Sequence, residues 1–254
     1  MIKLLKGDCL EVMKSIESGS VDAIICDPPY QITACKWDKL IPFDLMWEQL
    51  NRIIKPNGAV VLFGSEPFSS ALRMSNIKNY KYDWIWVKPN GSDPFQCRKR
   101  PMNNIEQISV FYFKQPLYNP QMIQRKMYKR KGGTEKIEIF DCVKDAEYKS
   151  DLRYPMRILE YKKPGQIGSN AERKLNKHHP TQKPIALMEY LIKTYTNENE
   201  IVLDFTMGSG STGVAAINTN RQFIGIEQDE NYYNIAVQRL EDAKKERDKL
   251  TLFK

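Results

Sequence analysis

The sequence predicts an α/β fold, in which a mostly parallel, twisted sheet is covered by helices on both faces. Short apolar runs of strand length alternate with segments of helical spacing at both ends of the chain. A glycine-rich turn at residues 204–212 joins one such strand to a helix. A length of 254 residues is enough for one large domain, or for one domain with an insertion.

The first 113 residues supply the elements of one half of this fold. The apolar run VDAIIC at residues 21–26 predicts a buried strand, which stops at Pro28 and Pro29. Residues 43–54 have apolar side chains at helical spacing and precede a Pro-Asn-Gly stop signal. The other elements expected here are strands at 2–5, 59–63, 82–87 and 107–113 and helices at 10–16 and 69–75.

The regular pattern is lost over residues 115–177, where polar and basic residues and Gly/Pro signals replace it. We expect an irregular insertion there, because loops of this length in a compact domain are usually functional. The pattern returns at Pro184, which suits the start of a helix. The elements expected after it are helices at 184–195, 214–218 and 231–250 and strands at 201–203 and 223–226.

The positive charge of the chain is concentrated in its middle third. The net charge is +8; residues 88–177 hold 20 Lys or Arg against 10 Asp or Glu, whereas the rest of the chain holds 19 against 21. The tyrosines interleaved with these basic residues are Tyr118, Tyr128, Tyr148, Tyr154 and Tyr161. Basic residues with aromatic neighbours suit a polyanion with stackable bases, although a solvated lysine-rich surface has the same composition.

Several classes of protein do not fit the composition. The longest apolar run is five residues (59–63), too short for a membrane span, and the N-terminal residues lack a signal-peptide pattern. Five scattered cysteines without a CxxC pair, and adjacent His178 and His179 far from any of them, predict neither a disulfide framework nor a metal site. We therefore expect a reduced, cytoplasmic protein without a membrane partner.

The glycine-rich turn carries the first candidate site. Gly208 and Gly210 let the backbone bend with a positive φ, and the helix after them offers free N–H groups to a ligand. The next strand ends on Glu227, where an acid in doubly wound folds binds ribose hydroxyls. These residues predict an adenosine-containing cofactor without a 2′-phosphate. The alternative is a purely structural turn, since neither a Walker loop nor the dinucleotide spacing is present.

The tetrapeptide Asp27-Pro28-Pro29-Tyr30 carries the second candidate site. The two prolines follow a buried strand directly, fix φ near −65° and hold their carbonyls at a set angle. The Asp27 carboxylate and the Pro28 carbonyl provide two acceptors, and Tyr30 provides a flat surface. Such a pocket fits a planar base whose exocyclic amine donates both N–H groups. A proline turn that only caps the strand is the alternative.

Together, the Asp-Pro-Pro-Tyr motif and the turn DFTMGSGST resemble the amino-methyltransferases of DNA, which methylate N6 of adenine or N4 of cytosine. The base motif precedes the cofactor motif, as in the β group of these enzymes. The resemblance covers nearly the whole chain and departs from the family where Asp204-Phe205-Thr206 replaces the common Asp-Pro-Phe. It implies a Rossmann-like, S-adenosylmethionine-dependent methyltransferase fold, circularly permuted, with a mixed seven-stranded twisted sheet flanked by helices and an irregular target-recognition insertion.

The resemblance also implies roles for individual residues. Asp27, Pro28, Pro29 and Tyr30 would be catalytic, with the flipped base stacked on Tyr30 and its amine bound by Asp27 and Pro28. No metal is implied. The residues expected to contact S-adenosyl-L-methionine are Asp8, Cys9, Asp27, Thr181, Lys183, Asp204, Phe205, Gly208, Ser209, Gly210, Ser211, Thr212 and Glu227.

The implied reaction is site-specific methylation of N6 of a flipped-out adenine in double-stranded DNA, because Asp at the first motif position favours adenine in this family. N4 of cytosine, RNA, a small-molecule substrate and a non-catalytic nucleic-acid-binding module stay open as alternatives. Residues 1–114 would form the catalytic half, 115–177 the target-recognition insertion and 178–254 the cofactor-binding half. We expect a bacterial, archaeal or phage origin; whether the protein forms a homodimer or has a partner restriction endonuclease is left open.

Overall fold

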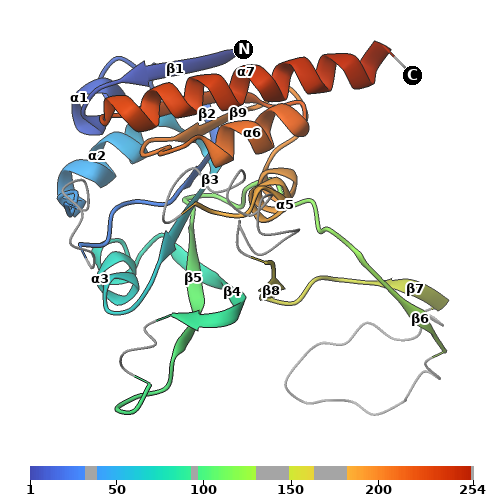
Figure 1. Cartoon of the computed structure of the whole chain (residues 1–254). Coiled ribbons are helices and arrows are strands. Elements are labelled where there is room, and N and C mark those ends of the chain that lie inside the picture. The colour runs from blue at the N-terminus through green and yellow to red at the C-terminus, as the bar shows by residue number, and fades with distance from the viewer. Residues whose placement is uncertain (32–38, 93–96, 130–148, 163–181, 253–254) are drawn as a thin grey trace. The chain divides into compact units, whose positions relative to one another are not determined.

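The computed structural model describes residues 1–31, 39–92, 97–129, 149–162 and 182–252. By its internal contacts the chain divides into two compact units, one of residues 1–119 and 157–254 and one of residues 120–156. The larger unit is an α/β structure built on one mixed sheet (Figure 1). The expected fold class is therefore confirmed.

The sheet of the larger unit has eight described strands in the order β1-β10-β9-β2-β3-β5-β4-β8. Neighbouring strands are parallel except at β5, which runs antiparallel to both β3 and β4. The strands are β1 (Ile2–Lys6), β2 (Val21–Cys26), β3 (Ile54–Gly64), β4 (Tyr80–Ser92), β5 (Asn103–Phe111), β8 (Ile158–Glu160), β9 (Ile201–Asp204) and β10 (Gln222–Glu227).

Helices cover both faces of this sheet. The three helices from the N-terminal part supply one apolar layer, and the three from the C-terminal part supply the other. The first group is α1 (Cys9–Met13), α2 (Phe43–Ile53) and α3 (Phe68–Ser75), and the second is α5 (Ile185–Tyr195), α6 (Ser211–Asn218) and α7 (Glu230–Leu252). No helix among these described residues is long and apolar enough to cross a bilayer.

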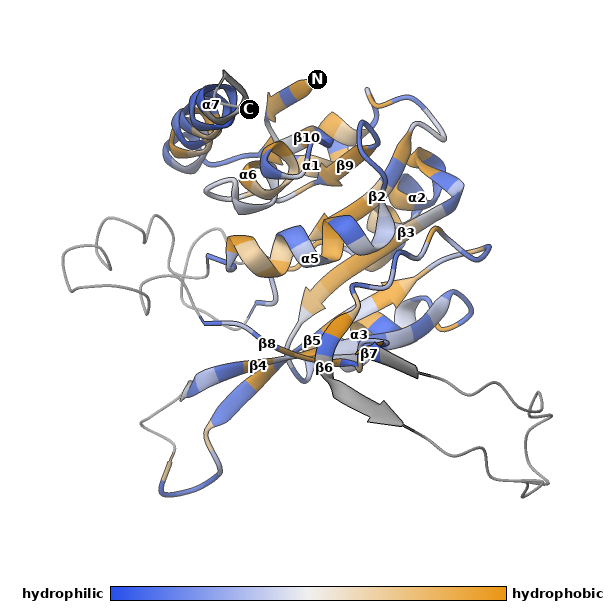
Figure 2. Cartoon of the chain, turned by 90° about the vertical axis from the view of Figure 1, so that its right-hand side faces the viewer, coloured by the Kyte–Doolittle hydropathy of each residue, from blue (hydrophilic) through white to orange (hydrophobic). Residues whose placement is uncertain are grey.

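The central strands are apolar on both faces, which is why their sequences read as continuous hydrophobic runs (Figure 2). In β2, Ala23 and Ile25 face the layer of α5, α6 and α7, while Ile24 and Cys26 face the layer of α1, α2 and α3. All four side chains are completely buried. This double coverage places the strand ends, rather than a sheet face, at the surface.

Three sequence expectations need correction. The sheet has eight described strands instead of seven, because the three-residue strand β8 pairs with β4 at the edge. Strand β3 begins at Ile54, and the expected stop signal at residues 56–58 lies inside a bulge, where the partner of β2 jumps from Ile54 to Ala59. The segment 115–177 is not wholly irregular, since it contains strands that pair with distant residues.

The smaller unit, residues 120–156, holds an antiparallel pair of strands, β6 (Ile123–Lys129) and β7 (Lys149–Arg153). Its register pairs Ile123 with Arg153 and Gln124 with Leu152. The Gln124 amide donates to the Asp151 carboxylate at 2.7 Å across the pair. Local periodicity did not predict these strands, because a two-stranded ribbon need not bury one apolar face.

Candidate functional site

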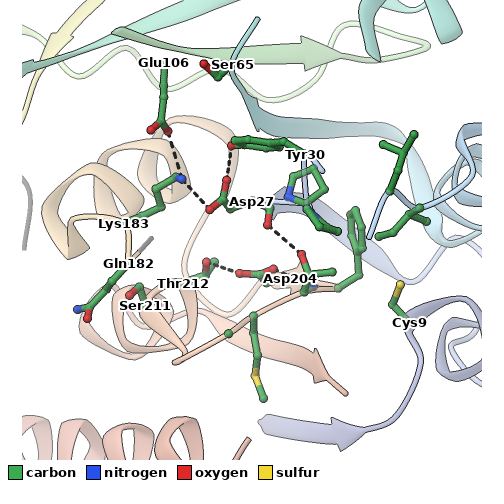
Figure 3. A pocket seen from close by; sticks show the side chains of 18 of the residues that line it. Cys9, Asp27, Tyr30, Ser65, Glu106, Gln182, Lys183, Asp204, Ser211 and Thr212 are labelled. Atoms are coloured by element: carbon green, nitrogen blue, oxygen red, sulfur yellow. Dashed lines mark hydrogen bonds and ion pairs between the residues drawn. The ribbon is translucent and has the colours of Figure 1, made fainter. Parts of the chain in front are cut away.

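A cavity of about 1090 Å³ lies in the larger unit at one edge of the sheet (Figure 3). It is lined by the segments that follow the carboxyl ends of β1, β2, β3, β9 and β10, and by the start of β5. Strands β9 and β2 are neighbours, but the chain proceeds from β9 to β10 on one side and from β2 to β3 on the other. Such a switch point is where open α/β sheets bind their ligands.

The glycine-rich turn follows β9 and begins α6. Gly208 has φ of +51° and Gly210 has φ of +80°, values that favour glycine. The Gly208 N–H donates to Glu227 Oε2 at 2.9 Å, and the Asp229 N–H donates to Oε1 of the same side chain at 2.8 Å. The buried Glu227 carboxylate therefore ties the turn to the end of β10, and burial raises its pKa.

Asp204 ends β9 and is buried without a cationic partner in the described part of the chain. The Thr212 hydroxyl donates to Asp204 Oδ2 at 2.5 Å, and the Thr206 N–H donates to Oδ1 at 3.2 Å. Burial raises the pKa of Asp204 to about 6. Ser211 Oγ, at the first turn of α6, is buried and has no hydrogen-bond partner among the described residues, although the residue lines the cavity. We call this part, with Glu227, the glycine-turn end.

Asp27 follows β2 at the other side of the same cavity, and Tyr30 closes over it. The Tyr30 hydroxyl donates to Asp27 Oδ1, and the Thr206 hydroxyl donates to the Asp27 backbone carbonyl at 3.1 Å. The Tyr30 ring packs against Phe68 with centroids 4.8 Å apart. Asp27 and Thr206 are 179 positions apart in sequence, so their hydrogen bond joins the two motifs directly.

Lys183 lies beside Asp27, where its ammonium is 2.6 Å from Asp27 Oδ2 and 3.2 Å from Glu106 Oε2 (Figure 3). Lys88 Nζ lies 2.5 Å from the other oxygen of Glu106. Burial alone would lower the pKa of Lys183, but the two carboxylates raise it. Burial raises the pKa of Asp27. At Glu106, the two neighbouring lysines outweigh the effect of burial and lower the pKa of the carboxyl. We call Asp27, Lys183, Glu106 and Lys88 the charged end.

The structure brings most of the sequence-predicted residues to this cavity. Of the residues expected to contact the cofactor, Gly210 belongs to the turn but does not line the cavity, since its Cβ side packs against Leu240 and Ala236 of α7, and Thr181 lies outside the described residues. Asp8 caps the N-terminus of α1, with its Oδ1 accepting the Leu10 N–H at 2.9 Å, and burial raises the pKa of Cys9 to about 12, so it is a thiol. The predicted residues that line the cavity are Asp8, Cys9, Asp27, Pro28, Pro29, Tyr30, Lys183, Asp204, Phe205, Gly208, Ser209, Ser211, Thr212 and Glu227.

Sequence reasoning missed Glu106 and Lys88. Both lie within the observed strands β4 and β5 but one residue outside the strands expected at 82–87 and 107–113, so nothing in the local pattern separates them from ordinary polar residues at strand ends. The available signal was the position of Lys88 at the end of the apolar run WIWV and of Glu106 at the beginning of the next strand. Because β4 and β5 are antiparallel neighbours, those two positions meet at the same edge of the sheet.

Comparison with known proteins places this geometry in a family. Residues 21–238 match a family model described as DNA methylase. The chain is 28% identical to the type II methyltransferase M2.LlaDCHI of Lactococcus lactis subsp. cremoris, over 93% of this chain and 88% of that protein. It is 24% identical to the type II methyltransferase M2.MboI of Moraxella bovis, over 93% of this chain and 86% of that protein.

Solved structures agree with this assignment. The crystal structure of an M1.HpyAVI–SAM complex is similar, with a TM-score of 0.63 and 30% identity over 94% of this chain and 99% of that one. The cytosine-N4-specific PvuII DNA methyltransferase shares the fold, with a TM-score of 0.68 and 18% identity over 95% of this chain and 90% of that one. Since the family model spans most of the sequence, this chain belongs to the DNA methylase family of N6/N4 amino-methyltransferases.

Proposed function

We propose that this protein transfers a methyl group from S-adenosylmethionine to the exocyclic N6 amine of an adenine that is flipped out of duplex DNA at a specific site. The observation that carries the proposal is the single cavity in which the Asp27 motif and the Asp204 turn meet, on adjacent strands β2 and β9. Membership of the DNA methylase family supports the reaction class. The choice of adenine over cytosine rests on Asp as the first residue of the base motif.

The glycine-turn end fits S-adenosylmethionine. Gly208, at positive φ, lines the cavity and lets a ligand approach its backbone closely. Among the described residues, the buried Ser211 hydroxyl has no hydrogen-bond partner and the buried Asp204 carboxylate has no cation beside it. Glu227, held by two backbone N–H groups, would accept hydrogen bonds from a ribose. A cationic amino-acid moiety near Asp204 would stabilise the ionised carboxylate. When bound, the cofactor supplies an electrophilic methyl group on a sulfonium.

Asp27 and Pro28 would hold the target amine. Hydrogen bonds from its two N–H groups to the Asp27 carboxylate and the Pro28 carbonyl would localise the nitrogen lone pair, which is otherwise delocalised into the ring. The N–C bond forms as the S–C bond breaks, and the nitrogen then releases one proton, for which the Asp27 carboxylate is the nearby acceptor. Phe68 covers one face of Tyr30 and the other face would stack on the base.

Duplex DNA would approach the open side of the cavity. Arg98 and Lys99 are exposed on the connection from β4 to β5, next to Arg100 and Pro101, which line the cavity. We assign target recognition to residues 115–177, between a catalytic half (1–114) and a cofactor-binding half (178–254). What supports this division is that residues 120–156 form a compact unit of their own. Basic residues there would contact phosphates and base edges.

The test is methyl transfer from labelled S-adenosylmethionine to DNA of mixed sequence, followed by digestion to nucleosides and mass analysis. N6-methyladenine that disappears in the Asp27→Ala variant is the expected result. N4-methylcytosine would keep the reaction class and overturn the choice of base. If wild-type protein binds the cofactor but methylates no DNA, the enzymatic proposal is wrong, and RNA becomes the next substrate to test.

A further inference from the structure

Four charged side chains form a row along the wall of the cavity: Lys88 and Lys183 are buried, whereas Glu106 and Asp27 are partly buried. The contacts run from Asp27 to Lys183 (2.6 Å), from Lys183 to Glu106 (3.2 Å) and from Glu106 to Lys88 (2.5 Å). The signs alternate and the formal charges cancel. The four residues come from the turn after β2, the segment before α5, strand β5 and strand β4, so only the folded chain assembles the row.

Burial makes this row different from an ordinary surface network. The side chains of Lys88 and Lys183 are each 7% exposed, and that of Glu106 is 13% exposed. Buried ion pairs lose much of their Coulomb energy to desolvation, and apolar replacements of similar volume are often as stable. Stability alone therefore does not account for placing these charges beside a binding cavity.

Lys183 is shared between two carboxylates, which determines how strongly it neutralises Asp27. Glu106 Oε2 pairs with the Lys183 ammonium at 3.2 Å, which is longer than the 2.6 Å contact of the same ammonium with Asp27, while Glu106 Oε1 is paired with Lys88. Without Glu106, the full charge of the ammonium would act on Asp27 alone. Without Lys88, Lys183 would be the single ammonium of the row for two carboxylates, Asp27 and Glu106.

We propose that Glu106 and Lys88 are positioning residues for the methyl transfer, which set the charge that Lys183 presents to Asp27. Glu106 moderates the lysine, so that the Asp27 carboxylate stays an effective acceptor for the target amine, and Lys88 balances Glu106, so that Asp27 stays ionised. This inference rests on the proposed function. Neither residue needs to touch the base or the cofactor. Glu106 acts through Lys183, and Lys88 acts through Glu106.

The other titratable groups around Asp27 are few in the described structure. The Tyr30 hydroxyl donates to it, while Cys26 and Asp204 lie near it on β2 and β9. Burial raises the pKa of Cys26 and of Tyr30 well above their ordinary values, so both are neutral near pH 7. The remaining acid of the cavity wall in this region, Glu66, is paired with Arg73. Two further cations, Lys39 and Arg100, line the same cavity and are exposed to solvent, so the row supplies the charges closest to Asp27.

The experiment is a set of pH–rate profiles on the full chain, measured as kcat for methyl transfer to DNA at saturating cofactor and DNA. The variants are Glu106→Gln, Lys88→Met and the charge-balanced double variant Glu106→Gln/Lys88→Met. Lys81→Met, which removes an exposed lysine of the same strand β4, is the matched control. Circular dichroism and thermal unfolding of each variant report folding separately from rate.

The two single variants should shift the acidic limb of the profile in opposite directions. Glu106→Gln leaves Asp27 facing more positive charge, so the limb should move to lower pH by about one unit, and kcat on the plateau should fall about tenfold. Lys88→Met leaves surplus negative charge, so the limb should move to higher pH by a similar amount. The double variant restores neutrality and should return the limb toward its wild-type position, while Lys81→Met should leave the profile unchanged.

A merely structural role would lower kcat in step with stability and leave the limb in place. Limbs that do not move, or that move in the same direction in both single variants, would overturn the inference. If Glu106→Gln does not fold, Lys88→Met and the double variant still give opposed expectations. Methylation of either base by wild-type protein keeps the reaction class, so the profiles then judge the row alone. A wild-type protein that methylates no DNA overturns both proposals.

Discussion

At the glycine-turn end of the cavity, Asp204 is buried against hydroxyl and backbone donors, whereas at the charged end Asp27 is buried against a lysine. In the first arrangement no cation in the described part of the chain pairs with the Asp204 carboxylate, and burial raises the pKa of Asp204 to about 6. The second arrangement already balances its charges within the protein. Under the proposed function, the first end would gain positive charge from a ligand, and the second would present an acceptor of fixed charge to a neutral base.

The largest expected effect is on the rate of methyl transfer, when the acceptor at the charged end is changed. Asp27→Asn removes the charge of the acceptor and keeps its size, so methyl transfer should fall about 10²- to 10³-fold or more, while the affinity for S-adenosylmethionine changes little. Single-turnover kinetics and calorimetric titration with the cofactor would measure the two quantities. A rate within a few-fold of wild type would show that Asp27 does not hold the amine.

The next effect is on stability at the charged end. Lys183→Met leaves Asp27 and Glu106 with Lys88 as the only ammonium of the row, so the free energy of unfolding should fall by about 3–5 kcal/mol. Urea denaturation at pH 7 would measure the change. Lys193→Met, at the other end of α5, serves as the control and should lie within about 0.5 kcal/mol of wild type. A similarly small change for Lys183→Met would contradict the ion pairing described here.

Removing the charge of Asp204, at the glycine-turn end, should raise the free energy of unfolding instead of lowering it. Because burial raises the pKa of Asp204 from 3.8 to about 6 in the folded state, its ionisation opposes folding, and stability falls as the pH rises from about 4 to about 6 and is level above that. At pH 8 the free energy of unfolding of Asp204→Asn should therefore exceed that of the cofactor-free wild type by up to about 3 kcal/mol. This advantage should shrink as the pH falls below 6.

The same variant should bind the cofactor more weakly, since its amide cannot balance a cation. Thermal unfolding at pH 5 and pH 8, with and without S-adenosylmethionine, measures both effects. The stability of Asp204→Asn relative to wild type should be higher at pH 8 than at pH 5. The reverse order would show that burial does not raise the pKa of Asp204. Full retention of cofactor affinity would remove Asp204 from the binding site.

The smallest effect concerns Ser211, whose buried hydroxyl lacks a partner in the structure. Ser211→Ala should leave the free energy of unfolding within about 0.5 kcal/mol of wild type, because no hydrogen bond is lost on mutation. The dissociation constant of S-adenosylmethionine should rise about 2- to 10-fold if the hydroxyl pairs with the cofactor. Calorimetric titration measures this change, and an unchanged constant would mean that the hydroxyl does not contact the ligand.

Local sequence patterns were sufficient where an element carries its own signal. Strand β2 was predicted with its observed limits because its continuous apolar run stops before Pro28 and Pro29. The predicted helix at residues 43–54 differs from α2 by one residue because its helical period lies between Pro42 and Pro56. The glycine turn was predicted because positive φ at Gly208 and Gly210 restricts the residue type. Strand β8 was not predicted, since three residues acquire strand geometry only by pairing with β4.

The sequence by itself determined the α/β class, the two motifs and the residue types that each motif offers to a ligand. Only the tertiary structure decided that Asp27 and Asp204 share one cavity, and that Lys183 faces Asp27 and Glu106 rather than the glycine turn. The physical reason is the distance along the sequence between the residues that specify each feature. Turns and helices are specified by neighbours along the chain, whereas the pairing of buried charges depends on which strands become neighbours when the whole sheet is assembled.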